Sequence, residues 1–263
     1  VKYNLQDRTI DTYYDASGID ATPSNNHTLT SGVYSSPTSY SAPTGGTTVS
    51  TGGTNGVPSG YTVLKFTGNS ALTVGTAGNV SILAVGGGGS GGSDYGGGGG
   101  AGGLVYDAVY AVTPNTYDMV RGVGGTGISA IDTAGNNGGD TTVTINGGAV
   151  QFTAKGGGGG GGETSPNRGV AGGSGGGGSY GPSTNGTGGA TTQAGTSQHG
   201  TVDVNIGYIG GAGVGTLSYN TAGGGGAGGA GEGATQSKSG DGGVGYNAGA
   251  IFGTAVGESG WFA

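Results

Sequence analysis

The sequence predicts an all-β fold with almost no α-helix: a small β domain with glycine-rich loops or polyglycine-II-like stacked segments. Three observations predict it. Glycine supplies 74 of the 263 residues, and each glycine costs a helix about 1 kcal/mol relative to alanine. Leu, Ile, Val and Phe together supply only 41 residues, which excludes a large aliphatic core. Short runs rich in β-branched and aromatic residues alternate with turn signals after residue 60.

Composition divides the chain into three regions. Residues 1–60 hold only 8 glycines and are rich in Ser, Thr, Tyr and Pro, and we interpret them as an N-terminal docking segment. They also carry an acidic cluster, Asp7, Asp11, Asp15 and Asp20. Residues 61–155 predict a β domain interrupted by glycine-rich loops. Residues 156–263 predict a glycine-rich region with short strands.

The middle region carries the clearest strand signals. Val80 to Val85 is apolar on both faces, because Val80, Ile82 and Ala84 alternate with Ser81, Leu83 and Val85. That pattern predicts a central strand. Further strands are expected at 61–67, 71–74, 104–106, 109–112 and 116–121, and a hairpin at 141–145 and 149–154.

Glycine has a period of three in part of the last region. Seven glycines run from Gly156 to Gly162, and Gly-x-x then repeats from Gly169 to Gly181. Three residues per turn is the period of a polyproline-II-type helix, and irregular glycine loops are the alternative. Strand-like islands stand at 202–209 and 250–252. Near the end, Trp261 and Phe262 are expected to anchor an interface or to close a small apolar pocket.

Nothing in the sequence indicates catalysis, so we expect no enzyme. Cysteine is absent, and the two histidines, His27 and His199, stand far apart. The loops around Asp94, Asp140 and Asp241 lack the ligand spacing of a calcium loop. We therefore expect no metal and no cofactor. The net charge of −7 argues against nucleic acid, and we expect no membrane span and see no signal peptide.

Tyrosine is the residue type with value for recognition. The chain has fourteen tyrosines, and Tyr95, Tyr180, Tyr219 and Tyr246 stand alone among polar residues and glycines. Tyrosine in a Ser- and Gly-rich loop offers a large contact area and a hydroxyl group at low entropic cost. We predict these four as receptor-binding residues exposed at one end of the molecule. The alternative is that each ring covers glycine backbone.

The order of the elements resembles a known family. The hairpin from Phe66 to Val74 precedes the strand that enters Gly86 to Gly89, and Phe152 to Lys155 opens onto the next long glycine run. This order, over residues 60–232, resembles the glycine-rich domain of bacteriophage tail-fibre and other virion structural proteins. The chain departs from that pattern at Met119 to Gly122, where such domains have Val-x-Val-Gly. The glycine tracts also resemble the adhesin tips of some long tail fibres, in which polyglycine helices stack and loops bind a host receptor.

This resemblance implies a non-enzymatic virion structural protein, a phage tail-fibre or other surface-fibre component that contacts the host receptor. Its location would be the virion surface. Its partners would be copies of itself in a homo-oligomer such as a trimer, other virion proteins, and a host cell-surface glycan or protein. The alternative is a subunit of a self-assembling extracellular filament or surface coat. An ice-binding surface is disfavoured, because the threonines form no regular array.

Overall fold

The computed structural model describes residues 61–163, 167–181, 185–193, 204–215 and 219–263 continuously. Of the N-terminal segment it describes strands β1 to β6, Gly46 and Val57. Both histidines and the acidic residues Asp7, Asp11 and Asp15 lie outside the described residues. The six strands of this segment are β1 (Lys2–Asn4), β2 (Tyr13–Tyr14), β3 (Asp20–Ala21), β4 (Thr28–Thr30), β5 (Val33–Ser35) and β6 (Thr47–Thr51).

The rest of the described chain confirms the predicted all-β class. Its strands are β7 (Tyr61–Lys65), β8 (Ser70–Val74), β9 (Gly78–Val85), β10 (Leu104–Val112), β11 (Asn115–Val120), β12 (Thr141–Ile145), β13 (Val150–Ala154), β14 (Val204–Ile206), β15 (Tyr246–Asn247) and β16 (Trp261–Phe262). The one helix among the described residues is α1 (Gly249–Phe252), a single turn.

Two antiparallel sheets form the β domain in the described part of the chain. The larger has the strand order β14-β10-β9-β1-β7-β6, and the smaller has the order β13-β12-β11-β8. β9 lies inside the larger sheet, between β10 and β1, which confirms the central position that its two apolar faces predict. Strand β14, from the glycine-rich region, completes one edge by pairing Leu104 with Ile206.

Strand β10 is longer than the sequence predicts. It joins the two expected short strands across Asp107 and Ala108, with a register shift between Asp107 and Tyr110. Asp107 is buried, and its Oδ1 accepts a hydrogen bond of 2.9 Å from the N–H of Val109. The bulge shifts the alternation of side chains by one residue, so that Val105 before it and Tyr110 and Val112 after it all belong to the same core.

Each face of the larger sheet packs against an apolar core. The first core fills the space between the sheets and takes Leu64, Ile82 and Ala84 from β7 and β9. The second lies on the opposite face and takes Val63 from β7, with Leu83 and Val85 packed against it. The alternation predicted for β9 is therefore confirmed. The face of the sheet that carries the second core is covered by three C-terminal residues, Ala248, Phe252 and Val256.

Three aromatic rings fill the middle of the first core. Tyr110 lies between Tyr117 and Phe152 in edge-to-face contacts, with ring centroids 6.4 and 4.8 Å away. Burying a large apolar side chain contributes about 1.5–3 kcal/mol. The hydroxyl of Tyr110 donates a 2.9 Å hydrogen bond to Oε1 of Gln151. Burial raises the pKa of Tyr110 to about 12, helped by Tyr117 and Asp107 nearby.

The island at residues 250–252, predicted as strand-like, forms helix α1 instead. The N–H groups of Ile251 and Phe252 both donate to the carbonyl of Ala248, and Gly253 stops the turn at a φ of +78°. The prediction was wrong because three apolar residues carry no periodicity that separates a strand from one helical turn. The burial of Phe252 against Tyr106 selects the turn, with ring centroids 5.9 Å apart.

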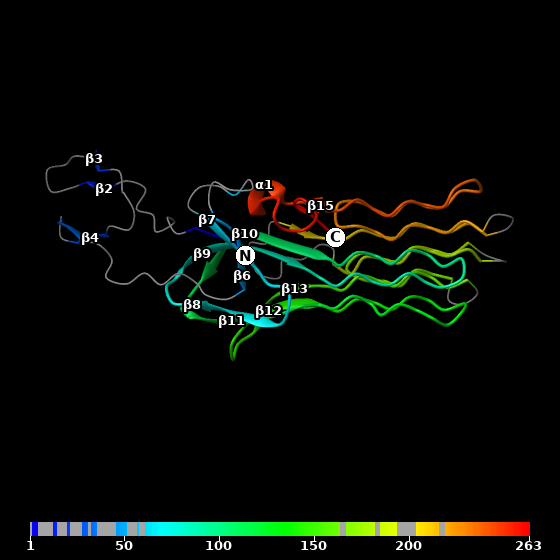
Figure 1. The fold of residues 1–263 in the computed structure, drawn as a ribbon, viewed down its shortest axis with the longest axis horizontal. Coiled ribbons are helices and arrows are strands. Elements are labelled where there is room, and N and C mark those ends of the chain that lie inside the picture. The colour runs from blue at the N-terminus through cyan, green and yellow to red at the C-terminus, as the bar shows by residue number, and fades with distance from the viewer. Residues whose placement is uncertain are drawn as a thin grey trace.

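The described glycine-rich segments leave the β domain side by side and in one direction (Figure 1). They run away from the sheets, turn at a common far end, and return. The C-terminus lies at the near end, where β15 pairs with β16 and sets Tyr246 opposite Phe262. Phe262 packs on the second core and Trp261 is 48% exposed, so one ring closes the core while the other faces solvent.

Candidate functional site

The glycine-rich segments pair as out-and-back hairpins. In the first, Gly86, Gly89 and Gly92 donate backbone hydrogen bonds of 2.8–3.0 Å to Gly103, Gly100 and Gly97. The bonding residues are three apart on both arms. The described parts of 122–140, 155–172, 173–193, 207–227 and 228–246 fold back in the same manner (Figure 1).

The hydrogen bonds between hairpins also have a period of three. The N–H groups of residues 156–161 go to three neighbours in turn. Gly157 and Gly160 donate to Gly87 and Ser90, Gly158 and Gly161 to Ser174 and Gly177, and Gly156 and Gly159 to the side chains of Asp140 and Asn137. Every third donor faces the same neighbour, as in a helix with three residues per turn. The described tracts are therefore three-fold helices rather than irregular loops.

We call this array of segments the glycine lattice. It satisfies the backbone groups that a chain poor in side chains would otherwise bury without partners. Most of its hydrogen bonds join the backbone of one tract to the backbone of another. Glycine is required because the chains touch: a Cβ atom at Gly158 would lie 1.9 Å from the carbonyl oxygen of Val170. At Gly175 and Gly178 the nearest carbonyl oxygens would be 1.9 and 2.2 Å away.

A few polar side chains occupy gaps inside the lattice. Ser174 is fully buried, and its hydroxyl donates to the carbonyl of Gly226 and accepts from the N–H of Tyr208. Ser179 is also fully buried and donates to the carbonyl of Gly162 over 2.6 Å. These serines connect neighbouring hairpins by hydrogen-bonding to buried peptide groups that the backbone alone does not satisfy.

Three of the four tyrosines predicted as binding residues meet at the far end. Tyr95 stacks on Tyr219 with ring centroids 4.6 Å apart, and Tyr180 lies 4.9 Å from Tyr219 and 6.1 Å from Tyr95. Tyr95 and Tyr219 are 51% and 59% exposed, whereas Tyr180 is buried. The three come from three different hairpins, and the N–H of Tyr180 donates to the carbonyl of Tyr95. Their rings form one aromatic platform, and two of its three tyrosines are exposed to solvent.

Tyr246, the fourth predicted residue, lies elsewhere. It is part of β15 at the near end of the lattice and packs partly buried against the second core. Its ring covers the protein's own interior, which is closer to the alternative expected for an isolated tyrosine than to an exposed binding residue. An isolated tyrosine therefore does not by itself identify the far end.

A cluster of acidic residues begins next to the aromatic platform, at Asp94. The N–H of Asp132 donates to Oδ2 of Asp94 over 3.2 Å, which joins the second hairpin to the first. The pKa of Glu163 is raised, by desolvation and then by a hydrogen bond and charge repulsion from Asp132 and by repulsion from Asp94. Three carboxyl groups from three hairpins thus approach one another. We call these residues, with Ser93, Ile131, Thr133 and the three tyrosines, the tip.

The backbone of the tip is strained. Asp94, Tyr95 and Asp132 have positive φ values of 43°, 45° and 52°. Such values are uncommon for residues other than glycine, and they are more unusual for bulky tyrosine than for aspartate. The surrounding bonds, including those between Ser93 and Thr133, hold the turns in place. Strain of this kind concentrates where a side chain must be presented in a fixed direction.

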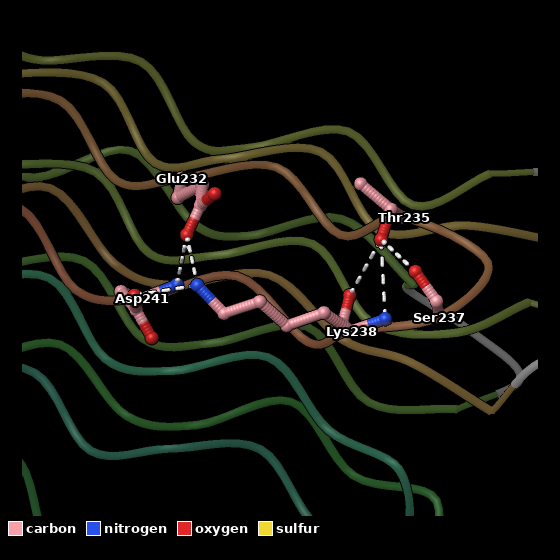
Figure 2. A network of polar contacts seen from close by, with 5 residues as sticks. All are labelled: Glu232, Thr235, Ser237, Lys238 and Asp241. Atoms are coloured by element: carbon pink, nitrogen blue, oxygen red, sulfur yellow. Dashed lines mark hydrogen bonds and ion pairs between the residues drawn. The ribbon is translucent and has the colours of Figure 1, made fainter.

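A further turn at the same end carries a network of charges (Figure 2). Nζ of Lys238 contacts Oε2 of Glu232 at 2.9 Å and Oδ2 of Asp241 at 2.6 Å. The ammonium group lowers the pKa of both carboxyl groups, and its own pKa is raised. Thr235 closes the turn by accepting from the N–H of Lys238. All three charged groups are exposed, so the network orders the turn more than it stabilises the fold.

Three residues of the tip, Ile131, Asp132 and Glu163, are not among the binding residues predicted from the sequence. Ile131 is 75% exposed at the tip, yet nothing in its own segment distinguishes it from a loop residue. A usable signal was that 126–134 and 163–168 interrupt glycine runs in the same way as the segment around Tyr95. Among the described residues no group of three His, Asp or Glu side chains is arranged to hold a metal ion.

Fold and tip together define a class: an elongated protein in which a β domain supports a lattice of three-fold glycine helices. The chain belongs to the glycine-rich domain family, whose model matches residues 65–261. The match reaches residue 261, whereas the order of elements in the sequence indicated a glycine-rich domain over residues 60–232. No curated protein and no solved structure matches the chain significantly. In the described residues, no helix has the length and apolar character to cross a membrane.

Proposed function

We propose that the protein is a non-enzymatic surface-fibre component of a virion, of the phage tail-fibre kind, and that its tip binds a host cell-surface glycan or protein. The observation that supports this most is the meeting of Tyr95, Tyr180 and Tyr219 from three separate hairpins. Two of these rings remain open to solvent at the end farthest from the β domain. Exposed aromatic side chains on a rigid scaffold are typical of binding surfaces.

The tip also offers polar groups beside the aromatic platform. Asp94, Asp132 and Glu163 provide hydrogen-bond acceptors, while Ile131 adds exposed apolar surface. Aromatic rings next to carboxylates suit a sugar, because a ring stacks on the apolar face and carboxylates accept from hydroxyl groups. The same surface suits a protein loop. Neither ligand requires catalysis or a cofactor.

Alanine substitution separates recognition from folding. Tyr95→Ala and Tyr219→Ala should each weaken adsorption to a bacterial strain that the parent binds. A binding hot spot is worth about 2 kcal/mol, or roughly 30-fold in affinity. The matched control is Tyr208→Ala, because Tyr208 is 40% exposed but lies beside Ser174, away from the platform. Adsorption that survives both tip variants with unchanged melting would refute the proposal.

The alternative proposal is a subunit of an extracellular filament or coat. It differs in what copies of the chain do with one another. Sedimentation over a wide concentration range distinguishes the two, because a filament grows without closing and a closed assembly keeps one size. A filament that forms through the tip, and loses assembly in Tyr219→Ala, would favour this second function.

A further inference from the structure

The exposed rings of the aromatic platform lie next to carboxyl groups of the tip. Tyr95, whose side chain is 51% exposed, directly follows Asp94 in the turn of the first hairpin. Asp94 is exposed as well, and its Oδ2 accepts from the N–H of Asp132 in the turn of the second hairpin over 3.2 Å. An aromatic surface and a carboxylate are therefore presented together, on turns that are bonded to each other.

The negative charge of these carboxyl groups is not balanced within the described part of the chain. Desolvation raises the pKa of Glu163, and a hydrogen bond and repulsion from Asp132, together with repulsion from Asp94, raise it further. The ion pairs of the described residues all lie outside the tip. Arg168, in the same hairpin as Glu163, is exposed and is not a member of any of these pairs. The tip thus presents negative charge beside its exposed rings.

An ammonium group suits both parts of this surface. The face of an aromatic ring carries partial negative charge and attracts a cation that lies within about 6 Å of the ring centroid. Tyr95 and Tyr219 stack with centroids 4.6 Å apart, so a cation beside one ring is also close to the other. A neighbouring carboxylate attracts the same cation and accepts hydrogen bonds from it. A neutral ligand would use only the rings, and an anionic ligand would be repelled.

The small extent of the tip favours a sugar over a protein as the carrier of this ammonium group. The described residues of the tip come from a few short turns, whereas a stable protein–protein interface takes about 20–30 residues from each side. A sugar unit needs only one aromatic ring for its apolar face and a few acceptors for its polar groups. Tyr219, 59% exposed, supplies such a ring.

We propose that the tip binds a glycan whose sugars carry protonated amino groups, with one sugar ring on Tyr219 and its ammonium group directed to Asp94 and Asp132. This inference rests on the proposed receptor-binding function and names the class of ligand for the same surface. Glycans whose amino groups are acetylated bind more weakly, because they keep the stacking and lose the charge. Glycans that carry carboxylates bind least.

Calorimetric titration with two sugar tetramers that differ in charge tests the ligand class. The β-1,4-linked tetramer of glucosamine carries ammonium groups at about pH 6, whereas the tetramer of N-acetylglucosamine is neutral. The glucosamine tetramer should bind roughly fivefold more tightly at low salt, because exposed ion pairs each contribute little. This advantage should vanish near 1 M salt, where charges are screened within about 3 Å. Equal binding of the two tetramers at low salt would overturn the proposal.

Asp94→Asn removes the charge and keeps the turn. Asparagine retains the side-chain oxygen that accepts from Asp132, and it tolerates the positive φ of 43° at this position. The variant should bind the glucosamine tetramer roughly fivefold more weakly and the acetylated tetramer as before, with an unchanged melting temperature. Asp118→Asn, on β11 in the β domain, is the matched control and should alter neither affinity. If both variants lose the same affinity, the overall charge of the protein attracts the sugar and the tip does not.

The remaining outcomes separate this inference from the proposed function. Tyr219→Ala should weaken binding of both tetramers and adsorption to cells. If neither tetramer binds the parent, yet cell adsorption depends on Tyr219, receptor binding stands and the amino-sugar ligand is wrong. If cell adsorption does not depend on Tyr219, both fail. If an acetylated tetralysine peptide binds more tightly than the glucosamine tetramer, the ligand is a basic protein segment and the glycan is wrong.

Discussion

Replacing one lattice glycine by alanine should cost far more than the methyl group suggests. At Gly175 a Cβ atom would lie 1.9 Å from the carbonyl oxygen of Gly189. Ordinary contact begins near 3.4 Å, so the two segments must separate by about 1.5 Å. The carbonyl of Gly189 also accepts from Gly210 at 3.0 Å, and the N–H of Gly189 donates to Gly176 at 2.7 Å. A shift of that size breaks both bonds.

The cost follows from the buried groups left without partners. Each broken bond leaves a buried peptide group unsatisfied at a cost of about 1–3 kcal/mol, so two broken bonds cost roughly 2–6 kcal/mol. The whole free energy of unfolding of a domain is about 5–15 kcal/mol. Gly175→Ala should therefore lower the melting temperature by roughly 10 °C or prevent folding. Thermal unfolding followed by circular dichroism and calorimetry measures this change.

A matched control separates contact from the conformational effect of glycine. At Gly127 an added Cβ atom would meet nothing within 4 Å. Gly127→Ala should leave stability unchanged or raise it by about 0.4–1 kcal/mol, because alanine narrows the unfolded ensemble. If Gly175→Ala melts together with Gly127→Ala, the close packing of the lattice is not what stabilises it, and the reasoning fails.

Three other perturbations test the lattice, the core and the tip. Ser174→Ala should lower the free energy of unfolding by about 1–3 kcal/mol, measured with denaturant, because it leaves the carbonyl of Gly226 and the N–H of Tyr208 without this hydrogen-bond partner. Ser237→Ala, at an exposed turn, is the control and should leave the free energy of unfolding unchanged. Tyr110→Phe should cost about 1 kcal/mol of unfolding free energy. The parent should also lose stability as pH rises from about 10 towards about 12, because the folded state holds the phenol proton more tightly than the unfolded state. If the Tyr110→Phe variant loses the same stability over the same pH range, this reasoning is wrong. The raised pKa of Glu163 means that its contribution to stability is present at low pH and is lost as pH rises through that pKa, so Glu163→Gln should raise melting at pH 7 and not at acid pH. The lowered pKa values of Glu232 and Asp241 have the opposite sign, so the protection of the amides in their turn, relative to free-peptide exchange at the same pH, should drop only as pH falls through these pKa values.

The sequence predicts the β domain well because its strands obey local rules. The alternation from Val80 to Val85 fixes both faces of β9, and Asn146 to Gly148 mark the turn between β12 and β13. Local rules fail where tertiary contact decides. Asp107 continues β10 by accepting from a neighbouring N–H, and residues 250–252 form a helical turn because Phe252 is buried.

The tip lies beyond what local patterns can predict. Isolation among glycines marks Tyr95, Tyr180, Tyr219 and Tyr246 equally, yet only the first three meet. The described hairpin turns share the far end, whereas Tyr246 lies in β15 at the near end. Which turns are neighbours depends on how the hairpins pack against one another, and this packing is set mainly by backbone hydrogen bonds. The glycine period of three predicts that the tracts form three-fold helices, but it does not predict which helices pack next to one another.

The lattice confines sequence freedom to the turns, and this favours a recognition role. Inside it, an added Cβ atom meets backbone at about 2 Å at Gly158 and Gly175, so almost any substitution is costly. At the turn that contains Gly127 there is open space. A change of side chain at Tyr95 or Ile131 disturbs no packed core, because both are exposed and the hairpin arms are held mainly by hydrogen bonds between peptide groups. A scaffold that tolerates change only where it contacts its surroundings can alter its binding partner without losing its fold. This separation supports the proposed receptor-binding tip over a passive coat, in which the exposed aromatic platform would have no role.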